Sequence, residues 1–262
     1  MPEHRLAVDV SHHQTPSAVP WERIAERSCL AIVRTSYGTL RDRQTAQHVQ
    51  HARDVGLAVS VYAFYRPSQP WRDQLAAMRS QAEAAGYGPG DVWPALDVER
   101  DPLPSPGTDV SPAWQSDVRY LLESLEDVYG GAIVYVTQRE YGMLGKPEWL
   151  LRYPLWVAHF TTKPAPATPA NRPWLIWQHR VGPYDPDGPG GYFPGGSPQL
   201  DQNRVAGDLP LVGQEPYPET HAPPEDDSDD EDLHRLSVLA MAQSEPYDVD
   251  DLRAERDEEI PS

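Results

Sequence analysis

The stretch that decides the fold is "VWPALDVER", residues 92–100, an apolar run that ends on two acids one residue apart. It follows the turn "GYGPGD" and precedes the proline-rich "DPLPSPG", so it predicts a short strand in a sheet buried on both faces. Because side chains alternate across a strand, Asp97 and Glu99 point to the same side. A strand that simply ends in solvated acids is the plainer interpretation, and the rest of the chain bears on the choice.

Strand-like and helix-like stretches alternate along residues 5–137, and after residue 150 short strands are joined by proline- and glycine-rich loops. Gly56 and Gly86 mark the ends of two helices, and Ser111 is the expected N-cap of a third. The predicted helices are 21–28, 43–56, 71–86 and 111–130, and the predicted strands are 5–10, 29–35, 57–65, 92–98, 132–137, 154–160, 173–180 and 199–205.

Such regular alternation implies parallel strands joined by crossover helices. Eight strands with about five helices predict an α/β fold, an irregular (β/α)-barrel whose last three units have lost their helices. A full barrel of this kind takes about 250 residues, so the shorter length here suits a trimmed one. The alternative is an open doubly wound sheet, but no glycine-rich phosphate loop follows the first strand.

Charge divides the chain into two parts. The net charge is −18, and 17 of the 40 acidic residues but only 3 of the 22 Lys and Arg lie in residues 214–262. We therefore expect a barrel domain at 1–212 and an acidic, proline-rich tail at 213–262. Direct nucleic-acid binding is disfavoured, because it requires clustered Lys and Arg.

The tail has little to bury and is predicted to be mostly disordered, with a short amphipathic helix at 232–243. Leu233, Leu236 and Leu239 fall on one face of that helix. We expect the tail to be dispensable for catalysis and to offer this stripe to a protein partner, against the simpler alternative of an inert solubilising tail.

The compartment is constrained by what the sequence lacks. A single cysteine, Cys29, cannot form an internal disulfide, and "MPEHRLAVDV" carries no secretory signal. No stretch is long enough to span a membrane. The expectation is a protein made in the cytoplasm without a signal peptide.

Carboxylates gather where a barrel places its active site, at the carboxyl ends of the strands. Asp9 lies near the end of the first strand, Asp97 and Glu99 close the fourth, and Asp201 lies in the last. Four acids at one mouth repel one another unless they bind a metal or divide acid and base roles. No His or Cys cluster accompanies them, so neither a metal nor another cofactor is expected.

At this point the chain resembles the glycoside hydrolase family 25 muramidases, the Chalaropsis-type lysozymes common among phage endolysins. The resemblance covers about residues 5–209 in family order, outside the tail. The matching pieces are "DVSHHQ" (9–14), "AIVRTSYG" (31–38), Asp42, Ala52, Gly56, "YAF" (62–64), "PALDVE" (94–99), "IVYVT" (133–137), "PLWVAHF" (154–160), "IWQH" (176–179) and "LDQNRVAG" (200–207).

The resemblance implies roles for eight residues. Glu99 matches the catalytic acid/base, Asp97 its partner, and Asp9 and Asp201 two further acids of the site. The residues that match substrate-contacting positions are Tyr62, Tyr135, Trp156 and Gln178.

Three positions depart from the family pattern. Arg34 stands for a lysine, Tyr37 for an acid before a glycine, and Ala63 for a histidine. These changes put the substrate subsites and the rate in doubt and leave the four acids in place.

The resemblance implies hydrolysis of the β-1,4 bond between N-acetylmuramic acid and N-acetylglucosamine in peptidoglycan glycan strands. Glu99 would protonate the leaving oxygen, and Asp97 would orient the substrate's acetamide for attack on the sugar carbon. An inverting route, with Asp97 or Asp201 activating water, stays open. The protein would act on the bacterial cell wall, after holin-type release or as part of a virion if phage-encoded.

Two rivals remain. One is a non-catalytic peptidoglycan-binding or virion structural protein that retains the lysozyme fold, motivated by the three departures. The other is a chitinase-like hydrolase, since those enzymes also use an Asp-x-Glu strand end.

Overall fold

The computed structural model describes residues 4–99, 112–193 and 198–214. The chain divides into two units, Met1–Pro224 and Glu225–Ser262. The second unit lies outside the described residues, as do the predicted helix at 232–243 and the predicted N-cap Ser111, so the tail and its boundary at 212/213 stay predictions.

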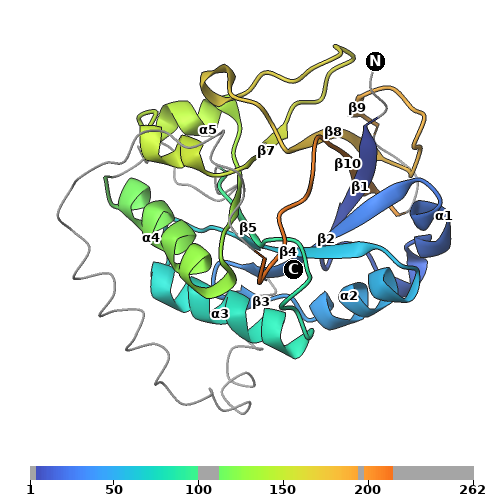
Figure 1. Cartoon of the computed structure of the whole chain (residues 1–262), viewed down its shortest axis with the longest axis horizontal. Helices are drawn as coiled ribbons and strands as arrows, with labels where there is room; N and C mark the ends of the chain where they lie inside the picture. The colour runs from blue at the N-terminus through green and yellow to red at the C-terminus, as the bar shows by residue number, and fades with distance from the viewer. Residues whose placement is uncertain (1–3, 100–111, 194–197, 215–262) are drawn as a thin grey trace, which may run out of the picture. The chain divides into compact units, whose positions relative to one another are not determined.

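The first unit is a barrel with helices outside it (Figure 1). The strands are β1 (Arg5–Val10), β2 (Ser28–Tyr37), β3 (Leu40–Arg41), β4 (Ala58–Phe64), β5 (Ala95–Asp97), β6 (Ile133–Tyr135), β7 (Leu155–Ala158), β8 (Ile176–Gly182), β9 (Gly191–Tyr192) and β10 (Leu200–Val205). The α-helices are α1 (Trp21–Ala25), α2 (Thr45–Asp54), α3 (Trp71–Ala84), α4 (Pro112–Tyr129) and α5 (Gln138–Met143), with short 3-10 turns at Pro16–Ala18, Glu148–Arg152 and Pro169–Asn171.

Eight of the strands close into a ring. The order is β1-β10-β8-β7-β6-β5-β4-β2, and β2 pairs again with β1, while β3 and β9 are short additions to β2 and β8. Each of the eight corresponds to one of the predicted strands, so the predicted barrel is confirmed. Strand β5 is shorter than expected, because Val92 leaves the ladder and bridges to Leu211 instead.

One strand departs from the parallel arrangement that the alternation implied. Strand β10 runs antiparallel to both β8 and β1. A parallel return requires a crossover long enough to span the sheet, usually a helix, and the described residues between β8 and β10, 183–193 and 198–199, form no helix and contain the short strand β9. Consequently β10 begins, rather than ends, at the mouth where the other strands finish.

The helices cover the first half of the barrel, where α2, α3 and α4 lie in succession along its outer side (Figure 1). Gly56 and Gly86 follow α2 and α3 with φ of 81° and 65°, as their predicted role as helix stops requires. The fifth helix, α5, is a single short segment capped by Thr137, whose hydroxyl accepts backbone N–H groups of Arg139 and Glu140.

A tight contact sets the spacing of the two central strands β5 and β6. Trp93 and Gly131 precede these strands, and a Cβ atom on Gly131 would overlap the indole ring of Trp93. Asp97 lies four residues after Trp93, and Tyr135 lies four residues after Gly131. This contact therefore fixes the relative position of the two strands that carry Asp97 and Tyr135.

We expect Gly131→Ala to lower the free energy of unfolding by about 1–3 kcal/mol, since overpacking a filled contact forces backbone shifts. Gly142→Ala in α5 is the matched control, because its Cβ would meet open space at an ordinary φ; it should be neutral or stabilising by up to about 1 kcal/mol. Urea denaturation followed by circular dichroism measures both, and equal stabilities would contradict the packing argument.

Candidate active site

The four predicted acids come together at one end of the barrel. Asp9 lies near the end of β1, Asp97 ends β5 with Glu99 two residues beyond, and Asp201 lies near the start of β10, directly opposite Asp9 in the register. Burial, and then the charges of all four carboxylates, raise the pKa of the Tyr135 hydroxyl. The four acids therefore surround one phenol at the mouth.

Asp9 is held by two amides. Its Oδ2 atom accepts hydrogen bonds from Gln178 Nε2 at 3.1 Å and from Asn203 Nδ2 at 2.7 Å. The amides are held in turn, since the Tyr135 hydroxyl donates to Gln178 Oε1 at 3.1 Å and Trp156 Nε1 donates to Asn203 Oδ1 at 2.8 Å. Burial raises the pKa of Asp9 to about 6, and the two amide donors oppose that rise.

The surroundings of Asp97 and Asp201 differ from those of Asp9. Burial raises the pKa of both well above the usual range, and neighbouring carboxylates, including Asp9 and Glu99, raise it further. The positive charge of Arg34 acts against the rise at Asp97. Within the described residues the buried Oδ1 atom of Asp97 has no hydrogen-bond partner, which leaves it available to a bound group.

Glu99 has the environment of a general acid. Burial raises its pKa to about 7, and the charges of Glu140 and Asp9 contribute. Glu140 lies in the first turn of α5, where its carboxylate accepts a hydrogen bond from Thr137 Oγ1. A proton therefore stays on Glu99 near neutral pH, as protonation of a leaving group requires.

The four residues predicted to contact substrate also lie beside the acids. The ring of Trp156 meets Tyr62 and Tyr135 edge to face, with centroids 5.8 and 4.8 Å apart. The three rings are buried, and so is the side chain of Gln178. In this arrangement they form the lining beneath the acids, and direct contact with substrate stays a prediction.

A cation is fixed at the edge of the acid cluster. Arg34 Nε donates to Asp42 Oδ2 at 3.2 Å, and its Nη2 contacts His12 Nδ1. The His12 backbone N–H donates to the same Asp42 oxygen at 2.8 Å. Burial and the charge of Arg34 lower the pKa of His12, so a neutral imidazole accepts from the guanidinium.

Two functional neighbours were not anticipated from sequence. Asn203 lies two residues after Asp201 in "LDQN", so strand alternation puts both on one side. Glu140 is the fourth residue of "TQRE", a capping-box pattern that predicts a helix start after β6. Strand alternation and the capping-box pattern can both be recognised in the sequence. Neither pattern indicates that Asn203 contacts Asp9 or that Glu140 lies near Glu99.

Within the described segments, no three His, Cys, Asp or Glu side chains are grouped so that they could hold a metal ion. In the same segments no helix is long and apolar enough to cross a membrane.

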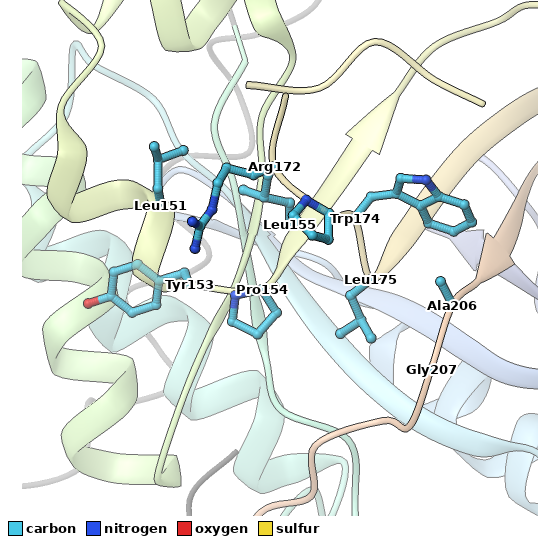
Figure 2. A pocket seen from close by; sticks show the side chains of 10 residues that line it. Leu151, Tyr153, Pro154, Leu155, Arg172, Trp174, Leu175, Ala206 and Gly207 are labelled. Carbon is cyan, nitrogen blue, oxygen red and sulfur yellow. The ribbon is translucent and has the colours of Figure 1, made fainter. Parts of the chain in front are cut away.

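A separate cavity of about 230 Å³ lies at the other end of the barrel (Figure 2). Pro154 and Leu155 stand at the start of β7, Leu175 precedes β8, and Ala206 follows the antiparallel β10. Trp174 and Arg172 complete much of its wall, and none of the four acids lines it. This cavity is therefore distinct from the acidic mouth.

The family model "Glycosyl hydrolases family 25" matches residues 8–187, which include three of the four acids and the strands that carry them. The chain belongs to glycosyl hydrolase family 25. As a member of this family it is a glycoside hydrolase. None of the curated proteins matches the sequence.

Several solved structures share the fold of this chain. A bacterial lysozyme from Streptomyces coelicolor is 21% identical with a TM-score of 0.62, over 79% of this chain and 94% of that one. A family 25 glycosyl hydrolase from Bacillus anthracis is 19% identical with a TM-score of 0.58, over 79% and 95%. The catalytic domain of endolysin ply40, from bacteriophage P40 of Listeria monocytogenes, is 19% identical with a TM-score of 0.57, over 79% and 95%.

We expect Glu140→Gln to lower the pKa of Glu99, because it removes a negative charge that raises it while leaving an oxygen to accept from Thr137. Carboxyl ¹³C NMR of glutamate-labelled protein measures the titration, with Glu99→Gln to assign the signal. The matched control is Glu148→Gln, an exposed acid outside the cluster, which should leave the titration in place; a shift of equal size there would contradict the assignment of the effect to Glu140.

Proposed function

We propose that this family 25 hydrolase is an N-acetylmuramidase that cleaves the β-1,4 bond between N-acetylmuramic acid and N-acetylglucosamine in peptidoglycan. The observation that carries the proposal is Glu99, a carboxyl with its pKa raised to about 7 beside the buried acids Asp9 and Asp97 and the half-buried Asp201. The relatives described as lysozymes and endolysins support the same substrate.

In the proposed reaction Glu99 gives its proton to the glycosidic oxygen as the bond to the sugar carbon breaks. Asp97 orients the acetamide of the same sugar, whose carbonyl oxygen attacks that carbon and forms a cyclic intermediate. Glu99, now ionised, takes a proton from the water that opens the ring, and the configuration is retained. The buried Asp97 Oδ1, with no partner among the described residues, suits an acetamide N–H.

The competing route inverts the sugar. There Asp97 or Asp201 would activate a water for direct displacement, and the first product would be the α-anomer. Proton NMR of the initial product separates the routes, and an initial α-anomer would exclude substrate assistance by Asp97.

Hydrolysis should fall as the pH rises through about 7, because Glu99 donates only when protonated and its pKa is about 7. Glu99→Gln should lower kcat by about 10²–10⁴-fold, the usual contribution of a general acid, with Glu148→Gln unchanged. Release of reducing ends from purified peptidoglycan measures both.

The same assay separates the rivals. A wild-type protein that binds peptidoglycan but releases no reducing ends is the non-catalytic binder. Cleavage of chitin oligomers without cleavage of cell walls would favour the chitinase-like hydrolase.

We further propose that the enzyme acts on the bacterial wall, after release from the cytoplasm or as part of a virion. We also propose that residues 213–262 serve docking to a protein partner and not catalysis. Val212 is tied to the barrel unit by its backbone, since its N–H donates to Asp91 O and its carbonyl accepts from the Gly90 N–H. A protein shortened to end at Val212 should keep the wild-type thermal midpoint and specific activity. Loss of most activity in the shortened protein would make the tail part of the enzyme.

A further inference from the structure

The amide of Asn203 has a forced orientation. The indole N–H of Trp156 can only donate, and it lies 2.8 Å from Asn203 Oδ1. The amide nitrogen must therefore face the other way, where it lies 2.7 Å from Asp9 Oδ2. Asn203 is fully buried, so water does not compete for either end.

A second amide meets the same oxygen from the neighbouring strand. Gln178 on β8 donates to Asp9 Oδ2, and its own oxygen accepts from Tyr135 on β6. An oxygen that accepts two N–H groups carries no proton of its own, and such donors favour the charged form of a carboxyl. Burial and neighbouring carboxylates raise the pKa of Asp97 and Asp201, and among the described residues only the charge of Arg34, at Asp97, acts against that rise.

We propose that Asn203 is a positioning residue for hydrolysis: its amide, oriented by the buried Trp156, holds Asp9 as the carboxylate that keeps its charge within the cluster. The inference rests on the proposed muramidase function for its effect on rate. Trp156 and Tyr135 then act on Asp9 through the two amides, and their contact with substrate stays a separate prediction.

The negative charge of Asp9 matters because it acts on the other acids of the site. Its negative charge raises the pKa of Glu99, so a charged Asp9 helps to keep the proton on the acid that donates it. It also disfavours ionisation of Asp97, which separates the roles of the acids. The titratable groups whose pKa Asp9 raises are Tyr62 on β4, Asp97 and Glu99 on and after β5, Tyr135 on β6 and Asp201 on β10. The Arg34 cation on β2 acts in the opposite direction on Tyr62 and Asp97.

The test is the acid limb of the pH profile of kcat. With Asp9 needed as a carboxylate, the wild-type limb lies near its pKa of about 6. Asn203→Leu keeps the volume and removes the donor, so the limb should move up by about one pH unit, which is about a tenfold loss below pH 6. KM should change less than kcat.

Trp156→Phe provides a second variant that leaves Asn203 in place. Without the indole N–H the amide can turn its oxygen toward a protonated Asp9 and accept its O–H, which favours the neutral form of Asp9, so the limb should move in the same direction. The matched control is Trp177→Phe, which removes the same group from an equally buried tryptophan that donates to His159 O at 2.9 Å instead. Its limb should stay in place.

A direct titration makes the result independent of activity. Carboxyl ¹³C NMR of aspartate-labelled protein, assigned with Asp9→Asn, should show Asp9 titrating at higher pH in Asn203→Leu and Trp156→Phe. An Asp9 titration that stays put, or kinetic losses that scale kcat equally at all pH values, would overturn the inference. If the wild type releases no reducing ends while the Asp9 titration moves, the proposed function fails and the hold on Asp9 stands.

Discussion

Four carboxylic acids are enclosed at one mouth of a barrel, and they cannot all be charged there at once. Desolvation and mutual repulsion both favour protonated forms, so the surroundings decide which acid keeps its charge. Two neutral amides favour ionisation of Asp9, and the cation of Arg34 acts on Asp97. Glu99 lies beside Glu140 and is held protonated to about pH 7. Differences in the surroundings, more than the acids themselves, separate the chemical roles.

Burying these acids lowers the free energy of unfolding at the pH values where the site would work. A carboxyl whose pKa is higher in the folded protein than in the unfolded chain stabilises the fold when protonated, and that contribution is lost as the pH rises. For Asp9 the loss falls between about pH 4, where the unfolded group titrates, and its folded pKa of about 6. The rest of the fold has to supply the compensation, and the strands carry many buried Val, Ile and Leu side chains.

Much of the fold follows from periodicity and punctuation in the sequence. Eight apolar runs gave the eight barrel strands, and Gly56 and Gly86 marked helix ends where positive φ is observed. The direction of β10 was less accessible, because a short apolar run carries no sign of which way it pairs. The four acids could be placed at one mouth from their positions in strands. Their partners could not, because Asn203 and Glu140 meet Asp9 and Glu99 through register and loop geometry that no local pattern encodes.

The departures from the family pattern fit together at the rim of the mouth. A lysine at position 34 would offer one compact ammonium, whereas the guanidinium of Arg34 reaches Asp42 and His12 at once through different nitrogens. The ring of Tyr37 packs on Phe64 at 4.6 Å between centroids and lies 6.0 Å from the Arg34 guanidinium. An acid at position 37 would instead compete with Asp42 for that cation. In this chain the rim therefore holds the Arg34 cation between Asp42 and His12, beside the aromatic rings of Tyr37 and Phe64.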